Sequence, residues 1–353
     1  IVGSNGGKMR LRDGNLEVEN VTLDCDADIL GQQFRSVGGN VNNGSMLLQL
    51  DGGNFGILQF DAPQTWNGTG EIVLNADSDS LLRYARINRT VPDDEVIHAA
   101  THTIRGTGEI FAALDNLGLI TADVPSRTIS LLSDDKKNKG TIRADQGRIQ
   151  IFSIEIDQTT GAGSPGTMEA VNGGEFSFES ATIEGGLIDV SGGSGVCASG
   201  INRFRSIEFD GTMDQITSGN EILDSITNNG LWVINTPRAN SRVLDLGPGC
   251  VIGGTGTFRL NSPTNSSNAQ IVTTTGQVES VTHGPAHTIE GEGGLTRLNM
   301  LNQGTLSPGF DGVIDPAIGV FELSLTSIMC EPTSTVVIEI EGAAATEHDR
   351  IVN

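Results

Sequence analysis

The 353-residue chain contains few aromatic residues and few lysines. Only 4% of its residues are aromatic, with one tyrosine and two tryptophans, and lysine occurs four times. Lysine and arginine together number 21 against 44 aspartates and glutamates, which gives a net charge of −23. Contacts to nucleic-acid phosphates need lysine and arginine, so this acidic composition excludes nucleic acid as a main partner. It also disfavours binding to an anionic membrane surface.

Long hydrophobic runs and cysteine pairs are missing as well. No stretch of 18 apolar residues occurs, so we expect no membrane insertion through a helix. Four cysteines, Cys25, Cys197, Cys250 and Cys330, lie far apart and form no Cys-x-x-Cys pair, which makes a zinc or redox motif a weak interpretation. Disulfides and buried free thiols are both compatible with this spacing. Because the chain starts at Ile1 without methionine, we expect a processed or partial sequence.

A short sequence motif recurs along the chain. His-Thr-Ile-x-Gly-x-Gly occurs at 102–108 and at 287–293, and each copy is followed by an Asn-x-Gly turn, at 116–118 and 302–304. A second unit, Asn-x-Gly-x-Ile-x-Ala-Asp, occurs at 116–123 and again at 138–145. Repetition of a small turn-strand unit is the sequence signature of a solenoid.

Two periodicities in these units predict the fold class. Polar and apolar residues alternate within each short run, as in a strand with one buried face, and Gly, Asn and Asp mark the corners between runs. Repeats of about 20 to 26 residues are too short for a βαβ crossover, which needs roughly 30. We therefore predict an all-β, right-handed parallel β-helix with three short strands per coil, in preference to an array of β-sandwiches. A narrow coil interior leaves little room for tryptophan or tyrosine.

The domain organisation that follows is a single β-solenoid over residues 1–353. We expect less regular N-terminal coils with insertions over 1–92, regular coils over 93–303, and C-terminal coils over 304–353. No linker rich in proline or serine separates independent units.

The C-terminal coils carry a resemblance to a known class of proteins. Gly-Thr-Leu-Ser-Pro-Gly at 304–309 is followed by Val-Val-Ile-Glu-Ile at 336–340 and by His-Asp-Arg-Ile-Val at 348–352. This series resembles a passage of autotransporter-like passenger regions and large secreted bacterial β-helix proteins, and the resemblance covers roughly residues 66–353. It implies an extracellular or bacterial cell-surface location, and such proteins include adhesins, surface fibres and stalks.

Acidic clusters are the candidates for a metal or catalytic site. Asp24, Asp26 and Asp28 alternate, so their side chains are expected on one face of a strand, where they could share a calcium ion. A solvated outer face is the more frequent use of such a pattern. The acidic run at 93–95, which His98 follows, is interpreted as a surface loop, and Asp-Asp-Lys-Lys at 134–137 as a turn with balanced charge.

The recurring histidines receive a structural interpretation. His102 and His287 occupy the same position of the repeat. A residue that recurs in every copy of a repeat more often has a structural role in the coil than a catalytic role. No Ser-His-Asp or Cys-His arrangement has a flanking motif that supports nucleophilic catalysis. We assign no catalytic residue from the sequence.

These features favour a secreted, non-enzymatic β-helix protein with a structural or adhesive role at a cell surface. Its partner is then either a second copy stacked end to end, as in a fibre, or a cell-surface or matrix glycan. The alternative is a polysaccharide lyase or hydrolase on the same scaffold, which predicts an acidic, calcium-dependent groove and turnover of uronate-rich glycans.

Overall fold

The chain folds into short parallel β-strands. The computed structural model describes residues 7–12, 14–51, 55–61, 63–76, 85–90, 95–159, 164–217, 219–236, 241–262, 268–309, 320–337 and 350–352. Within this part of the chain there is no helix, and so none that is long and apolar enough to cross a membrane. The prediction of an all-β parallel solenoid is confirmed, whereas its right-handed sense stays a prediction.

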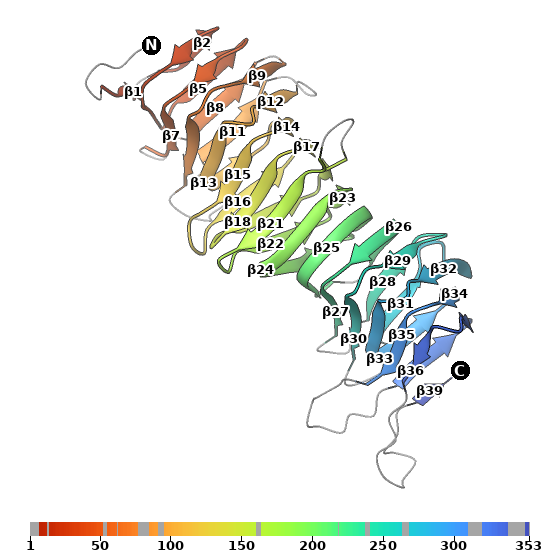
Figure 1. Cartoon of the computed structure of the whole chain (residues 1–353). Coiled ribbons are helices and arrows are strands. Elements are labelled where there is room, and N and C mark those ends of the chain that lie inside the picture. The colour runs from red at the N-terminus through yellow and green to blue at the C-terminus, as the bar shows by residue number, and fades with distance from the viewer. Residues whose placement is uncertain are drawn as a thin grey trace. The chain divides into compact units, whose positions relative to one another are not determined.

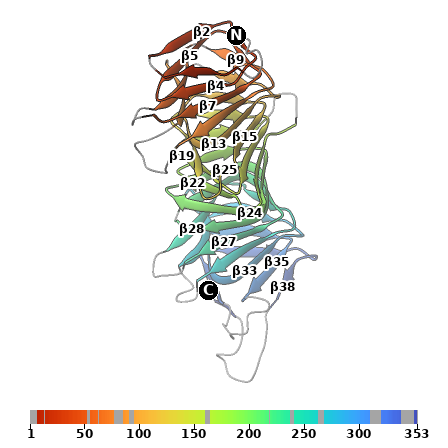
Figure 2. The same cartoon turned by 90° about the vertical axis from the view of Figure 1, so that its left-hand side faces the viewer.

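Two compact units divide the chain, Ile1–Ser177 and Phe178–Asn353, with the boundary inside β22 (Glu175–Glu179). Within each unit the strands lie side by side as parallel arrows (Figures 1 and 2). Strands pair with strands one coil away rather than with their sequence neighbours, and consecutive strands enter three different stacks in turn. This order gives the three strands per coil that the sequence predicts.

In the first unit the three stacks are well defined by their pairings. The first stack contains β1 (Met9–Leu11), β4 (Ala27–Leu30), β7 (Ser45–Gln49), β10 (Glu71–Asn75), β13 (Thr103–Ile110), β15 (Leu119–Ala122), β18 (Thr141–Asp145) and β21 (Thr167–Val171). The second contains β2 (Leu16–Glu19), β5 (Gln33–Val37), β8 (Gly56–Phe60), β11 (Ala85–Arg89), the end of β13, β16 (Thr128–Leu132) and β19 (Arg148–Phe152). The third contains β3 (Thr22–Leu23), β6 (Val41–Asn42), β9 (Gln64–Trp66), β12 (Val96–His98), β14 (Leu114–Asn116), β17 (Lys136–Asn138) and β20 (Glu155–Asp157).

The second unit begins with longer strands, and its later strands form three stacks of their own. Its first strands are β23 (Thr182–Glu184), β24 (Leu187–Ser199), β25 (Arg203–Gln215) and β26 (Asn220–Asn228). Its first stack continues through β27 (Leu231–Asn235), β30 (Thr257–Asn261), β33 (Thr288–Thr296), β35 (Thr305–Pro308) and β38 (Thr335–Val336). Its second runs through β28 (Arg242–Leu246), β31 (Ala269–Thr273), the end of β33, β36 (Val320–Ser324) and β39 (Arg350–Val352). Its third contains β29 (Val251–Gly253), β32 (Glu279–His283), β34 (Leu298–Asn302) and β37 (Ser327–Cys330).

The core consists of columns of apolar side chains that run from coil to coil. Strands such as β7, β10 and β30 alternate half-exposed and buried residues, as their period of two predicts. In the first unit, register places Ile72, Ile104, Ile120, Ile142 and Met168 in one such column. Each is at most 2% exposed, and burial of a side chain of this size stabilises the fold by about 1.5 to 3 kcal/mol.

Both tryptophans also lie inside the coils, which corrects the expectation that the interior has little room for them. Trp66 is 1% exposed and Trp232 is 0% exposed. Edge-on aromatic contacts accommodate them, for instance between Phe60 and Trp66, whose ring centroids lie 5.5 Å apart, and between Phe204 and Trp232 at 5.1 Å.

Buried amides form a second kind of column at the corner that follows the third stack. Asn116 Nδ2 donates to Asn138 Oδ1 at 2.8 Å, and Asn138 Nδ2 donates to Gln158 Oε1 at 2.9 Å. All three side chains are at most 1% exposed. Each side-chain amide therefore donates a hydrogen bond to the amide of the next coil. These hydrogen bonds offset the penalty for burying polar groups and fix the register of the corner.

The two units are built on the same template of corner residues. Asn228-Asn229-Gly230 repeats Asn42-Asn43-Gly44, and Gly254-Thr255-Gly256 repeats Gly68-Thr69-Gly70, each 186 positions later (228 − 42 and 254 − 68). A Cβ on Gly68 would lie 1.9 Å from the carbonyl oxygen of Asn42, and a Cβ on Gly254 would lie 2.0 Å from that of Asn228. The same close approach thus requires glycine at the same corner of both units.

Candidate functional site

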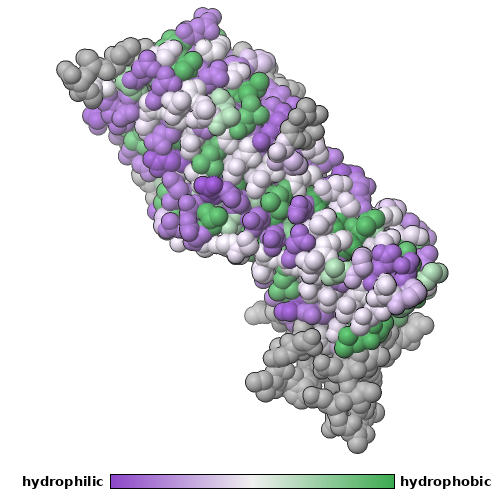
Figure 3. Space-filling model, in the orientation of Figure 1, coloured by the Kyte–Doolittle hydropathy of each residue, from purple (hydrophilic) through white to green (hydrophobic). Residues whose placement is uncertain are grey.

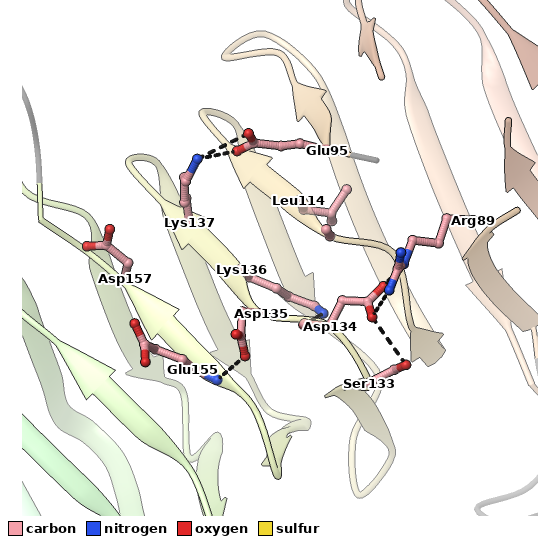
Figure 4. Close-up of a pocket in the computed structure, with 11 residues that line it drawn as sticks. Arg89, Glu95, Leu114, Ser133, Asp134, Asp135, Lys136, Lys137, Glu155 and Asp157 are labelled. Carbon is pink, nitrogen blue, oxygen red and sulfur yellow. Dashed lines mark hydrogen bonds and ion pairs between the residues drawn. The ribbon is translucent and has the colours of Figure 1, made fainter. Parts of the chain in front are cut away.

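A groove on the surface of the first unit is the candidate functional site. It has a cavity volume of about 430 Å³ and crosses four successive coils, where the chain passes from the second stack to the third (Figure 4). Its lining residues are Arg89, Glu95, Ala113, Leu114, Ser133, Asp134, Asp135, Lys136, Lys137, Glu155 and Asp157.

Each coil contributes to the groove at the same turn. Arg89 ends β11, Leu114 begins β14, Lys136 begins β17, and Asp157 ends β20. Because parallel strands of successive coils lie about 4.8 Å apart, side chains from the same turn form a ladder along the stack. The groove is therefore a direct product of the repeat.

Lys136 is the unusual residue of this site, because it occupies an inward position. It lies in register with Ile156 of β20, and the pairing of Asp115 with Lys137 places Leu114 of β14 in the same inward row. Its exposure is 3%, whereas Lys137 beside it is exposed. A lysine thus stands in a row that is otherwise filled by aliphatic side chains.

The Lys136 amine lies against the turn that precedes β17. Nζ donates to the carbonyl oxygen of Asp134 at 2.6 Å and to that of Leu132 at 3.3 Å. Burial disfavours the ammonium form and lowers the pKa of Lys136 to about 7, although the nearby carboxylates of Asp134 and Asp135 oppose this change. At neutral pH the groove therefore contains an amine that is protonated in only part of the molecules.

Ion pairs fix the side chains around Lys136. Arg89 binds Asp134 through two guanidinium nitrogens, and Lys137 Nζ lies 2.9 Å from a Glu95 carboxylate oxygen (Figure 4). The Asp135 carboxylate accepts a hydrogen bond from a backbone N–H of β20 at 2.7 Å. These contacts connect three coils and hold the walls of the groove in one arrangement.

The charge balance of the groove is negative. Five carboxylates line it, those of Glu95, Asp134, Asp135, Glu155 and Asp157, against three basic side chains, those of Arg89, Lys136 and Lys137. A polyanionic ligand would be repelled by the carboxylates of the groove and also by the net negative charge of the whole chain. Hydroxyl or amino groups of a ligand, in contrast, would find carboxylates and amines to bond with.

The three carboxylates considered as a candidate calcium site, those of Asp24, Asp26 and Asp28, make separate contacts. Asp24 and Asp26 are exposed, and Asp24 accepts a hydrogen bond from Asn43 at 2.6 Å. Asp28 is buried instead and pairs with Lys8 at 2.6 Å. Among the residues that the structure describes, no group of three or more His, Cys, Asp or Glu side chains is arranged to hold a metal ion.

Two loop interpretations change with the structure. The turn predicted at 134–137 is confirmed only in its first half: the chain bends at Asp134, whereas Lys136 and Lys137 belong to strand β17 and Lys136 points inward. Of the acidic run at 93–95, residues 93 and 94 lie outside the described residues and Glu95 lines the groove. His98, expected beside a surface loop, is 1% exposed at the end of β12.

A sequence signal for the inward lysine was present. Asn138 begins a repeat unit and is buried, and side chains alternate along a strand, so Lys136 has to share the side of Asn138. The ion pairs across coils had no such signal, since they join residues as far apart as Arg89 and Asp134.

On the face shown in Figure 3, hydrophobic residues form small, separate groups among polar ones. The cysteines offer no disulfide: all four thiols are free, and only that of Cys330 is exposed.

No family model, curated protein or solved structure matches this chain. The candidate site therefore has to be interpreted from its own geometry.

Proposed function

We propose that this protein is a non-enzymatic β-solenoid of the bacterial cell surface that binds a glycan along the groove of its first unit. The single observation that carries the proposal is the groove itself. It is polar, it crosses four coils, and its walls are fixed by ion pairs between those coils. A rigid ladder of this kind suits an extended ligand with repeating hydroxyl groups.

The chemistry of the lining narrows the class of ligand. Carboxylates are bidentate acceptors for sugar hydroxyls, and an ammonium group donates to ring and hydroxyl oxygens. Because carboxylates outnumber basic groups, we expect neutral or amino-bearing glycans to bind better than uronate-rich ones. The resemblance of the C-terminal coils to secreted β-helix proteins supports the surface location.

The test is a binding screen on immobilised neutral, amino-bearing and uronate-rich glycans. The wild type should bind members of the first two classes, and Asp135→Asn with Asp157→Asn should weaken that binding at least tenfold. Asp24→Asn with Asp26→Asn, which removes the same charge outside the groove, is the matched control and should leave it unchanged. Equal loss in both variants would point to net charge rather than to the groove.

A lyase or hydrolase is the second candidate, and Lys136 is the observation that favours it. An amine with a pKa of about 7 is in the range of a general base at neutral pH. Against this role, its nitrogen already donates to two backbone carbonyls. Product analysis of the same glycan panel decides: release of unsaturated or reducing ends by the wild type, lost in Lys136→Met, would establish catalysis.

The other partner that we propose, from the sequence, is a second copy of this chain, stacked end to end. Electron microscopy of the native material distinguishes this assembly from a monomer that binds a glycan. Fibres would establish the structural version, and the groove would then lie repeated along the fibre.

A further inference from the structure

Each unit contains one buried chain of two histidines and two asparagines. In the first unit, His98 Nδ1 lies 2.6 Å from Asn116 Oδ1, His98 Nε2 lies 3.1 Å from His102 Nδ1, and His102 Nε2 lies 3.0 Å from Asn42 Nδ2. Trp66 Nε1 adds a second donor to His102 Nε2 at 3.3 Å. We call this arrangement the histidine relay.

The second unit contains the same relay with nearly the same distances. His283 Nδ1 lies 2.6 Å from Asn302 Oδ1, His283 Nε2 lies 3.0 Å from His287 Nδ1, and His287 Nε2 lies 2.9 Å from Asn228 Nδ2. Phe258 packs edge-on against His287 in this copy, with ring centroids 4.7 Å apart. All four imidazoles are at most 1% exposed.

Backbone carbonyls fix the direction of the first relay at both ends. Asn42 Nδ2 also donates to the carbonyl oxygen of Glu71 at 3.0 Å, so Asn42 presents a donor and His102 Nε2 must accept. At the other end, Asn116 Nδ2 donates to the carbonyl oxygen of Thr141 at 3.3 Å, which leaves Asn116 Oδ1 as the acceptor for His98. The second relay is fixed in the same way, because Asn228 Oδ1 accepts from the Gly230 N–H at 3.1 Å.

Only one protonation state satisfies this chain. His98 Nδ1 must donate to Asn116, so His98 Nε2 must accept from His102 Nδ1, and His102 Nε2 must accept from Asn42. Both rings are therefore neutral, with the proton on Nδ1. A further proton on either Nε2 would point one N–H at another in a buried site.

The charged groups around the first relay are already paired. The carboxylate of Glu71 on β10 interacts electrostatically with His102, but it is bound to Arg105 of β13 at 2.5 Å. Asp115 of β14, next to Asn116, pairs with Lys139 at 2.7 Å. Both of these carboxylates are thus already bound to a basic side chain, although Asp115 Oδ1 has no hydrogen-bond partner.

The second relay has the same kind of surroundings. Glu290 of β33 is bound to Arg259 of β30 at 2.6 Å on the outer face, and the thiol of Cys330 lies 3.9 Å from Asn302 Nδ2. Burial lowers the pKa of His98 to about 4 and the pKa values of His102 and His287 to about 3, and it also lowers the pKa of His283.

We propose that the two histidine relays are acid-operated latches, each of which keeps its unit closed at neutral pH and opens the surrounding coils when its rings are protonated. The unfolded chain takes up both protons near pH 6.5, whereas the folded relay takes them up only well below that. Stability is therefore complete above pH 6.5 and falls as the pH drops below it. With two histidines per relay, the unfolding equilibrium constant of a unit should rise up to about 100-fold per pH unit between pH 6 and 4.

Nitrogen NMR of the native, ¹⁵N-labelled protein tests the latch without any substitution. The chain has five histidines, and four of them should show a protonated Nδ1 and an unprotonated Nε2 at both pH 7 and pH 5. His348, which lies outside the described residues, serves as the reference. Titration of the four rings near pH 6.5, or a proton on Nε2, would overturn the proposal.

Paired variants test the consequence for the fold. Glutamine can both donate and accept, so His98→Gln with His102→Gln removes the titration and keeps the polar partners. We compare amide hydrogen exchange at pH 5 and pH 7, corrected for the intrinsic exchange rate at each pH. In the wild type, the corrected exchange of β12 and β13 should be faster at pH 5 than at pH 7, and in this variant it should be the same at both. In the same variant β32 and β33 should still open, as an internal control. Equal acid opening of β12 and β13 in both proteins would refute the latch, and should the variant fail to fold, the ring titration decides alone.

Discussion

Replacement of Lys136 by methionine is the most informative single change in the groove. Methionine has nearly the length of lysine and no charge, so it fits an inward row that also contains Leu114 and Ile156. If the buried amine serves a ligand and not the fold, its removal should make the protein more stable.

The magnitude follows from two opposing effects. Burial lowers the pKa of Lys136 from 10.5 to about 7, which costs about 4 kcal/mol of stability at pH 7. Its removal also takes the Nζ donor away from the carbonyl oxygens of Leu132 and Asp134, at about 1 to 1.5 kcal/mol each. We expect Lys136→Met to be more stable by about 2 kcal/mol at pH 7, equivalent to about 5 °C in Tm.

The sign of the pH dependence provides an independent check. Above pH 7 the folded lysine is neutral while the unfolded one still binds a proton up to pH 10.5, so wild-type stability should rise between these values. Urea unfolding at pH 7 and pH 9.5 should show a gain of about 3 kcal/mol in the wild type from this residue, and the gain should be absent in Lys136→Met.

The control is Lys137→Met, at the exposed position beside it. This change should alter stability by less than about 0.5 kcal/mol, as is usual for surface positions. A Lys136→Met protein that is less stable than the wild type by 2 kcal/mol or more, with an unchanged pH dependence, would refute the reasoning, because the ammonium would then be a structural clamp of the turn.

Three further predictions concern the scaffold. Gly254→Ala should cost about 3 kcal/mol or more by urea unfolding, since its Cβ would lie 2.0 Å from the Asn228 carbonyl oxygen, whereas Gly276→Ala, with no atom within 4 Å, should cost about 1 kcal/mol for its positive φ. Asn138→Ala should cost about 2 to 4 kcal/mol because two buried amides lose a partner, while the exposed Asn299→Ala should be nearly neutral. One thiol of four should react with a disulfide reagent in the native protein, that of Cys330, since the others are buried and burial raises the pKa of Cys250 to about 12; three or four fast thiols would contradict the packing.

The fold could be predicted from the sequence because its signals are local. Period-two alternation and glycine corners are present in each run, and parallel stacking follows once the runs repeat. The relays were only partly predicted: His102 and His287 lie in the repeated motif and were given a structural role, whereas His98 and His283 were not recognised as their partners. A signal for these partners was present, because Val-x-His-x-x-x-His occurs at 96–102 and again at 281–287. Pairing between Asn42 and His102 across 60 positions is a product of the coil register alone.

The groove was harder to predict for a related reason. Its basic residues are spread over coils, and the pairing of Arg89 with Asp134 is set by the number of residues in the coils between them. That number varies with insertions at corners, which alternation within a run does not reveal. The inward lysine was not predicted either, because 134–137 was interpreted as a turn, although alternation back from Asn138 carried the signal.

The central claim is that ligand binding belongs to the groove of the first unit, and hydrogen exchange with a bound oligosaccharide tests it most directly. The protein should be incubated with a glycan from the panel that it captures, and exchange compared with the free protein. We predict slower exchange confined to the segments around Leu114, Ser133–Lys137 and Glu155–Asp157, with exchange in the second unit unchanged. Slower exchange elsewhere with these segments unaffected, or capture of no glycan at all, would contradict it.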